Sequence, residues 1–371
     1  MTGTRTVVRH APGKLFVAGE YAVVEPGTPA IVTAVGRTVT VTVRAADEPG
    51  VVIASDLVAQ PMRWRWRGDR LEVCPGQDGP LVRRAAAHVV SAVETVARLL
   101  AEHGLPAPQL HVSVSSDLHE AGTKFGLGSS GAVTVAAVAA VAAHHGLELS
   151  LESRFRLALL ATARIDPNGS GGDLAASTWG GWVAYRAPDR AFVLDLALRR
   201  GVGEALRAPW PGLAVRPLPP PRGLRLEVGW TGRPASTTSL VAGLHRRTWR
   251  GSASHQEFIK TSTDFVNAAT DALETGDDGA LLHQIRRARE ELARLDAEER
   301  LGIFTPELTA LCAAAEAVGG AAKPSGAGGG DCGIALLDAA AGHDIAHVRQ
   351  RWAATGVQPL SVGPTPERNQ E

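Results

Sequence analysis

The chain has 371 residues, of which 44% are hydrophobic and 20% are charged. Domains usually contain about 100–200 residues, so this length predicts two globular domains rather than one. The hydrophobic fraction is enough for a sizeable core, so the composition argues against wholesale disorder. Lys plus Arg and Asp plus Glu both number 38, and a chain without net charge has no general attraction for nucleic acid or an anionic membrane, so we expect neither as a partner.

The amino terminus, MTGTRTVVRHAPGK, lacks the apolar core of a signal peptide. The longest apolar stretch, residues 132–143, is shorter than the about 20 residues that a membrane-spanning helix needs. Three cysteines, Cys74, Cys312 and Cys332, have no C-x-x-C spacing, which argues against a disulfide framework or a zinc site. We therefore expect a soluble protein in the reducing cytoplasm.

The first half of the chain predicts strands followed by helices. Valine and threonine alternate over residues 38–43, which is the pattern of a half-buried strand. Tryptophan and arginine alternate over residues 63–67 and predict a further strand, at the edge of a sheet. Apolar residues at helical spacing predict a helix over residues 82–102, and residues 111–114 again resemble a strand.

A proline-rich stretch, residues 208–223, follows these elements. It contains six prolines, and proline at that density does not continue a helix or a central strand. We therefore predict a domain at 1–207, a junction at 208–223 and a second domain at 224–371. Strands and helices occur on both sides of the junction, so the fold class predicted is α+β.

A glycine-rich segment, FGLGSSGA, leads directly into the apolar stretch 132–143. Glycines let the backbone approach a ligand closely, and the start of a helix offers unpaired N–H groups and a partial positive charge to a phosphate. A plain structural loop is the alternative. The letters also satisfy G-x-G-x-x-G, but residues 116–125 separate the preceding strand from the first glycine, which disfavours a dinucleotide-binding fold.

Three other segments carry candidate functional residues. Lys14 lies in PGKLFVAGEY, where a fixed cation could hold an anion; an ordinary surface lysine is the alternative. Asp173 follows a run of small residues and is either a helix cap or a carboxylate in a cleft. The stretch KPSGAGGGDCG, residues 323–333, can wrap around a ligand or form a tight turn.

The order of these segments resembles that of the GHMP kinase superfamily, which includes galactokinase, homoserine kinase and mevalonate kinase. PGKLFVAGEYAVV, FGLGSSGA and KPSGAGGGDCGIAL resemble its three motifs in the expected order. KFGLGSSGA, STWGGWVAY, GWTGRPAST and GGGDCGIAL are most similar to the bacterial phosphomevalonate kinase family. The resemblance implies a two-domain GHMP kinase fold with the active site in the interdomain cleft. It also implies ATP and Mg²⁺ as cofactors and 5-phosphomevalonate as the small-molecule substrate, converted to 5-diphosphomevalonate in the mevalonate pathway of isoprenoid synthesis.

The resemblance also implies roles for individual residues. Asp173 matches the catalytic carboxylate, and Lys14 matches the cation beside it and beside the substrate. The glycine-rich loop matches the ATP phosphate site, with Ser130 as the Mg²⁺ ligand; its residues are Gly126, Leu127, Gly128, Ser129, Ser130, Gly131 and Ala132. Ser325, Gly326 and Ala327 match the segment that closes over the phosphates. Lys124, Tyr21 and Ser170 are further candidates for holding the substrate.

One departure from the superfamily concerns the metal. Mevalonate kinases place a glutamate on Mg²⁺ about eleven residues before the catalytic aspartate, but here that position is Thr162, and the one acid nearby is Asp166. We therefore assign no acidic ligand to the metal. Three alternatives stay open: mevalonate kinase, a non-catalytic metabolite sensor on the same fold, and an NAD-dependent enzyme. Intact Lys14, Ser130 and Asp173 argue against the sensor.

Overall fold

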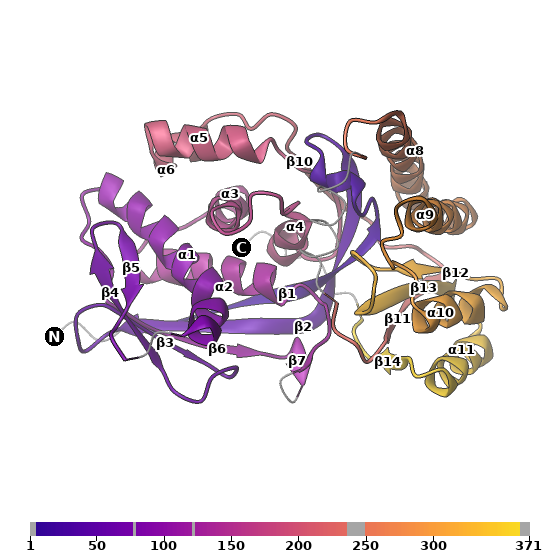
Figure 1. The fold of residues 1–371 in the computed structure, drawn as a ribbon, viewed down its shortest axis with the longest axis horizontal. Helices are drawn as coiled ribbons and strands as arrows, with labels where there is room; N and C mark the ends of the chain where they lie inside the picture. The colour runs from indigo at the N-terminus through magenta and orange to yellow at the C-terminus, as the bar shows by residue number, and fades with distance from the viewer. Residues whose placement is uncertain (1–4, 77–78, 121–122, 236–248, 364–371) are drawn as a thin grey trace.

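The computed structural model describes residues 5–76, 79–120, 123–235 and 249–363. It has two α+β parts that lie side by side, the N-terminal one on the left of Figure 1 and the C-terminal one on the right. Buried residues of both parts, Val43 and Phe265 among them, belong to one continuous hydrophobic core.

The N-terminal part is built on an eight-stranded sheet. The strands follow the order β10-β9-β2-β6-β3-β4-β5, and β1 pairs with β2 outside this path. Their bounds are β1 Val7–Ala18, β2 Pro29–Ala45, β3 Val51–Ser55, β4 Met62–Arg67, β5 Arg70–Val73, β6 Leu110–Ser116, β9 Trp182–Arg186 and β10 Ala214–Leu218. In β2, Val39, Val41 and Val43 are buried and the threonines between them are half-buried, which confirms the predicted alternation.

Helices cover one face of this sheet. α2 and α4 pack directly on β1 and β2, and α1 and α3 pack against α2 (Figure 1). The valines at helical spacing in α1, Val89, Val93 and Val96, are buried, as the apolar stripe predicted. The helices of this part are η1 Ala22–Val24, α1 Pro80–Glu102, α2 Ser129–His144, α3 Leu151–Ala163, α4 Gly172–Trp179, α5 Arg190–Arg200 and α6 Val202–Arg207. A two-stranded hairpin, β7 His119–Glu120 and β8 Thr123–Lys124, precedes α2.

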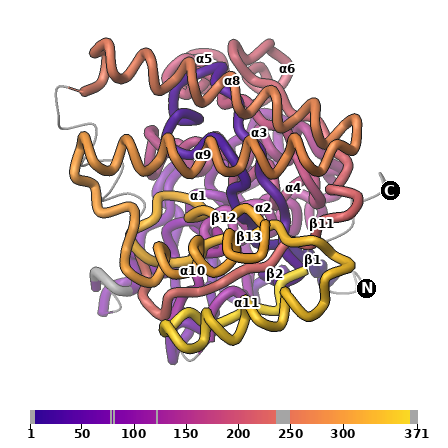
Figure 2. Tube along the Cα trace, turned by 90° about the vertical axis from the view of Figure 1, so that its right-hand side faces the viewer, coloured from indigo at the N-terminus to yellow at the C-terminus, as the bar shows by residue number. Residues whose placement is uncertain are grey.

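The C-terminal part has a four-stranded antiparallel sheet in the order β12-β13-β11-β14. Helices α8 and α9 run side by side across the molecule, and α10 and α11 pack against the small sheet (Figure 2). The bounds are β11 Leu224–Trp230, α8 Ala253–Thr275, α9 Asp278–Glu299, α10 Pro306–Glu316, β12 Ala321–Pro324, β13 Cys332–Asp338, α11 Gly342–Ala354 and β14 Gln358–Leu360.

Two sequence expectations differ from the fold. The strand at residues 63–67 is not an edge strand, because β5 pairs with its outer side. The proline-rich stretch 208–223 contains β10, which is the last strand of the large sheet and pairs with β9. Pro217 is tolerated there because an edge strand has one side without a neighbour, so the missing N–H costs nothing. The domain boundaries themselves stay a prediction.

Among the described residues, no helix combines the length and the apolar character that crossing a membrane requires.

Candidate active site

Lys14 lies at an irregularity in β1. The pairing of β1 with β2 shifts register here: Pro12 pairs with Thr38 but Lys14 pairs with Ala34, so β2 has extra residues opposite Gly13, and such irregularities commonly re-aim a neighbouring side chain. Glycine is needed at position 13, since a Cβ atom there would lie 2.6 Å from the carbonyl oxygen of Leu127. The Lys14 N–H donates to that same oxygen at 2.8 Å, and its Nζ donates to the carbonyl of Gly126 at 3.3 Å. These two hydrogen bonds attach Lys14 to the glycine-rich loop.

The glycine-rich loop ends at the first turn of α2. Gly126 and Gly128 have φ angles of 77° and 76°, a left-handed conformation that favours glycine. α2 begins at Ser129 without a side-chain cap from the described residues, so its first N–H groups remain available for an anion. Ser129 and Ser130 are half-buried at this end, and Leu127 and Ala132 are buried.

Asp173 reaches the same place from α4. Gly171 precedes α4 with φ 78°, which leaves Asp173 in the first turn of the helix. The side chain packs so closely on α2 that a Cβ atom at Gly131 would lie 2.5 Å from Asp173 Oδ2. A Cβ atom at Gly128 would lie 2.7 Å from Cγ of Lys14 and 3.5 Å from Cβ of Asp173. Glycines at and just before the start of α2 therefore make room for both charged side chains.

The charges of Lys14 and Asp173 influence each other across this space. Burial raises the pKa of the Asp173 carboxyl above its ordinary value, whereas Lys14 and the Leu174 N–H act in the opposite direction. Leu174 donates to Asp173 Oδ1 at 3.0 Å. A half-buried cation and carboxylate beside a helix amino terminus can neutralise a phosphate and orient an acceptor atom.

The third glycine-rich segment joins the site from the C-terminal part. The Ser325 hydroxyl accepts from the Phe16 N–H and donates to the Phe16 carbonyl, both at 2.9 Å, so it fixes β1 to this segment. Gly326 faces the site, because a Cβ atom there would lie 4.0 Å from Lys14 Nζ. The carbonyl of Ala327 accepts from the Tyr21 hydroxyl at 2.5 Å, and both residues are buried.

The weaker substrate candidates lie in different surroundings. Ser170 precedes α4, where its Oγ accepts from the Gly172 N–H at 3.3 Å and its carbonyl accepts from the Tyr185 hydroxyl at 2.6 Å. Lys124 is exposed at the end of β8. The Tyr21 hydroxyl already donates its hydrogen to the Ala327 carbonyl. Ser170 and Lys124 are therefore better able to donate to a substrate. All three assignments stay predictions.

Sequence reasoning missed His88, which supports the first turns of α2. Its Nδ1 lies 3.3 Å from the Thr134 hydroxyl, and that hydroxyl donates to the Ser130 carbonyl at 2.8 Å. The hydroxyl has one hydrogen, so Nδ1 is the donor to Thr134 and the imidazole is the neutral Nδ1–H form. Burial and nearby Lys124 lower the pKa of His88 to about 4, which keeps it neutral at pH 7. A lone histidine on a helix gives no sequence signal for this role.

A buried ion pair behind the site was also missed. Lys323 Nζ donates to Glu20 Oε1, with side-chain exposures of 0% and 3%. Glu20 follows β1 and Lys323 lies in β12, so the pair joins the first and third glycine-containing segments. Glu20 Oε1 also accepts from the Gly326 N–H at 3.4 Å. Both residues stand within the motifs, but the sequence does not reveal that they pair.

The described residues contain no cluster of three or more His, Cys, Asp and Glu side chains suited to a metal. They do fit Mg²⁺ in a simpler way, because this ion keeps several waters and binds substrate phosphates together with one or two protein oxygens. The Ser130 hydroxyl lies at the amino terminus of α2, and its assignment as such a ligand stays a prediction.

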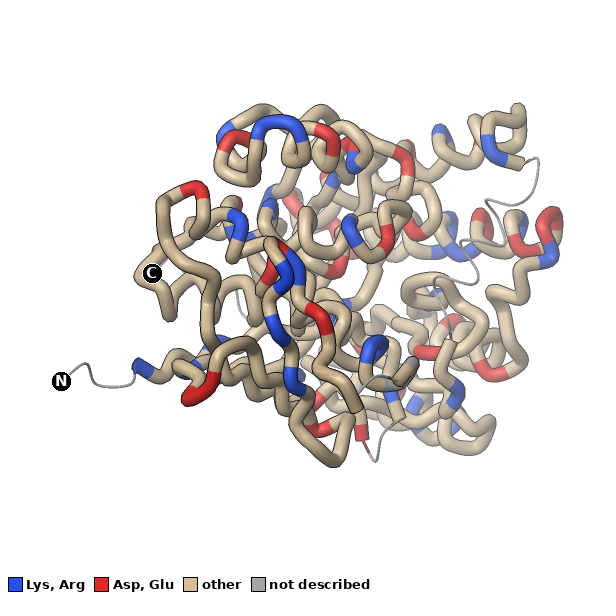
Figure 3. Tube along the Cα trace, turned by 60° about the vertical axis from the view of Figure 1, so that its left-hand side comes forward, with Lys and Arg blue, Asp and Glu red and all other residues tan. Residues whose placement is uncertain are grey.

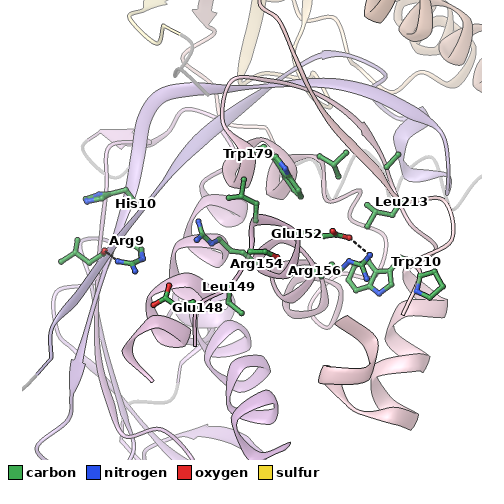
Figure 4. A pocket seen from close by; sticks show the side chains of 16 residues that line it. Arg9, His10, Glu148, Leu149, Glu152, Arg154, Arg156, Trp179, Trp210 and Leu213 are labelled. Atoms are coloured by element: carbon green, nitrogen blue, oxygen red, sulfur yellow. Dashed lines mark hydrogen bonds and ion pairs between the residues drawn. The ribbon is translucent and has the colours of Figure 1, made fainter. Parts of the chain in front are cut away.

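A hollow of about 1480 Å³ lies away from these residues. It is bordered by the start of β1, the start of α3 and the far end of α4, with Arg9 and His10 across from Trp210 in Figure 4. None of the predicted site residues lines it. Basic and acidic residues are interspersed along the chain in Figure 3, in keeping with the zero net charge.

Comparisons with known proteins agree with this arrangement. Residues 87–181 match the GHMP kinases N terminal domain, and residues 270–354 match the GHMP kinases C terminal domain. The phosphomevalonate kinase of Streptomyces sp. (strain CL190) is 70% identical over 370 residues, which are 99% of each chain. The mevalonate kinase of Aeropyrum pernix is 31% identical over 88% of this chain and 87% of its own.

A solved structure extends the likeness to three dimensions. The phosphomevalonate kinase of Streptococcus pneumoniae in complex with phosphomevalonate and AMPPNP has a TM-score of 0.84 at 27% identity, over 97% of this chain and 100% of that chain. The architecture, the motifs and the full-length identity agree with one another. The chain therefore belongs to the GHMP kinase family, within which it groups with the phosphomevalonate kinases.

Proposed function

We propose that the chain transfers the γ-phosphoryl group of ATP to the phosphate of 5-phosphomevalonate and so forms 5-diphosphomevalonate and ADP. The observation that carries this function is the 70% identity, over 99% of both chains, to a phosphomevalonate kinase. The place where Lys14, Asp173 and the amino terminus of α2 meet supports phosphoryl transfer as the chemistry. The solved relative with phosphomevalonate and AMPPNP supports the same pair of ligand types.

Lys14 and Asp173 act on the acceptor. The second pKa of a phosphate monoester is about 6, so the attacking oxygen is already largely ionised near pH 7. Proton removal by Asp173 is therefore a smaller contribution than it would be for an alcohol, and Asp173 chiefly orients the acceptor. Lys14, whose Nζ donates to Gly126 at the phosphate loop, offsets the repulsion between two anions that must approach each other.

The N–H groups at the start of α2 hold the phosphates of ATP. Gly128 to Ala132 lie there, and the helix dipole favours negative charge at this end. The Ser130 hydroxyl would hold Mg²⁺, which would supply further neutralisation of the phosphate charge when bound. Ser325, Gly326 and Ala327 close over the acceptor side. Lys124 and Ser170 contribute to holding the substrate, and Tyr21 contributes through its hydrogen bond to the Ala327 carbonyl.

We place the enzyme in the cytoplasm, acting on small molecules without nucleic acid or membrane partners. The three cysteines are free thiols, which supports a reducing compartment. The equal numbers of acidic and basic residues support the absence of polyanionic partners.

The direct test measures ADP release with Mg-ATP and four separate acceptors: mevalonate, 5-phosphomevalonate, 5-diphosphomevalonate and homoserine. We expect turnover with 5-phosphomevalonate alone. Turnover with mevalonate in its place would keep the fold and the mechanism but contradict the acceptor. ATP binding without turnover on any acceptor would favour the metabolite sensor.

A further inference from the structure

Asp331 has a backbone conformation that ordinary residues avoid. Its φ is 53°, and only Tyr21 and Arg300 share a positive φ among the other described non-glycine residues. This left-handed conformation costs a non-glycine residue roughly 1 kcal/mol, somewhat less for Asp or Asn. Gly328, Gly329 and Gly330 adopt positive φ immediately before it. Glycine would suit position 331 better locally, so the Asp331 side chain must supply an interaction that glycine cannot.

That interaction is with the segment 231–235, which follows β11. The Asp331 N–H donates to the Arg233 carbonyl at 2.8 Å, and its carbonyl accepts from the Thr231 N–H at 2.9 Å and the Thr231 hydroxyl at 3.1 Å. The side chain adds a fourth bond, because Oδ1 accepts from the Ala235 N–H at 2.9 Å. One residue thus holds both ends of this short segment.

The same carboxyl group lies against the start of the glycine-rich loop. A Cβ atom at Gly126 would collide with Cγ of Asp331 and would lie 2.6 Å from its Oδ2. The Gly126 carbonyl in turn accepts from Lys14 Nζ. Neighbouring contacts reinforce this junction: the Cys332 thiol donates to the Phe125 carbonyl at 3.0 Å, and the rings of Phe125 and Trp230 meet edge to face at 5.2 Å.

A charge on Asp331 does not favour the binding of two anionic ligands nearby, since a carboxylate repels phosphate. Burial raises the pKa of the Asp331 carboxyl, while the Ala235 N–H and Lys14 act in the opposite direction. The geometry gives it a different use, as an acceptor that joins the C-terminal sheet to the loop beside Lys14.

We propose that Asp331 is a positioning residue for phosphoryl transfer. Its Oδ1 fixes the segment 231–235 to the start of β13. Its carboxyl group sets how closely this part of the chain packs on Gly126, and hence where the phosphate loop lies relative to Lys14. This inference rests on the proposed kinase function. Small errors in placement are costly in such a site, because a displacement of about 1 Å can reduce turnover roughly 100-fold.

Three substitutions at position 331 separate the contributions that the Asp331 side chain could make to turnover: its charge, its acceptor oxygen and its tolerance of a positive φ. Asp331→Asn keeps an acceptor oxygen and tolerates positive φ but removes the charge. Asp331→Gly tolerates positive φ but removes the acceptor, and Asp331→Ala loses the acceptor and adds backbone strain. We expect kcat with 5-phosphomevalonate to fall at least about tenfold in the Asp331→Gly and Asp331→Ala variants. The Asp331→Asn variant should keep a kcat close to that of the wild type.

Two results would overturn the proposal. If the kcat of Asp331→Asn fell as far as that of Asp331→Gly, the charge and not the hydrogen bond would matter. If Asp331→Gly retained full kcat, the side chain would have no role in transfer. Hydrogen exchange at the Ala235 amide of the unliganded variants tests the contact independently of turnover. We expect faster exchange in Gly and Ala than in Asn; equal exchange in all three would refute the contact. If the wild-type chain turns over no phosphomevalonate, the proposed function fails, and the exchange result still judges the contact.

Discussion

At the scale of single residues, Asp173 is the side chain on which the proposed phosphoryl transfer depends most. Asp173→Asn preserves the size of the side chain and its capacity to accept from Leu174 but removes the charge facing Lys14. We expect kcat to fall by about 100-fold, while the KM for ATP changes less than about threefold, because the carboxylate acts on the acceptor and not on the nucleotide. Steady-state kinetics measures both. Asp189→Asn, at the cap of α5, is the matched control and should leave kcat unchanged. Near-normal turnover of Asp173→Asn would remove this residue from the chemistry.

Ser130 provides a second test at this scale, directed at the metal. Ser130→Ala removes one hydroxyl and no backbone donor, so we expect the Mg²⁺ concentration for half-maximal activity to rise by about tenfold, with a smaller change for ATP. Ser129→Ala, the neighbouring hydroxyl at the same helix end, is the comparison. A Mg²⁺ titration that is identical for wild type and Ser130→Ala would refute the ligand assignment.

At the scale of elements, α2 and α4 must pack closely for Asp173 to reach its place. Gly131→Ala would insert a Cβ atom 2.5 Å from Asp173 Oδ2, so the carboxylate has to move. We expect kcat to fall at least about tenfold. Gly342→Ala, at the start of α11, is the control, since no atom lies within 4 Å of its added Cβ atom. The control should keep kcat and change stability by no more than about 1 kcal/mol. Equal kcat in both variants would show that the α2–α4 contact does not position Asp173.

The elements also show which parts of the fold the sequence could predict. Alternating valine and threonine identified β2, and the apolar stripe identified α1, because both patterns depend on local periodicity. The glycine-rich segments marked the loops that meet at Lys14. Three features depend on segments far apart in sequence, so no local pattern indicates them: the register shift between β1 and β2 beside Gly13, the positive φ of Asp331 and the hydrogen bonds of the Ser325 hydroxyl to Phe16. Strand β10 was hidden by Pro217, which only an edge position permits.

At the scale of the whole molecule, the Glu20–Lys323 pair joins the two parts of the chain. Removing one partner leaves a buried charge, so Glu20→Gln or Lys323→Met should each lower the free energy of unfolding by about 3–5 kcal/mol. The double variant Glu20→Leu with Lys323→Met should lose less than the sum, since no charge is left unpaired. Urea denaturation measures these values. Asp195→Asn, which breaks an exposed pair with Arg199 on α5, should cost at most about 0.5 kcal/mol. Single variants as stable as wild type would show that the pair does not hold the parts together.

The central claim is that this fold transfers a phosphoryl group from ATP onto a phosphate. The most direct measurement is ³¹P nuclear magnetic resonance of the products formed from Mg-ATP and 5-phosphomevalonate. We predict the loss of the monoester signal and the appearance of two coupled diphosphate signals from the acceptor, in amounts equal to the ADP formed. Inorganic phosphate with an unchanged monoester signal would mean hydrolysis of ATP, and a second monoester signal would mean transfer to a hydroxyl group; either result would contradict the account.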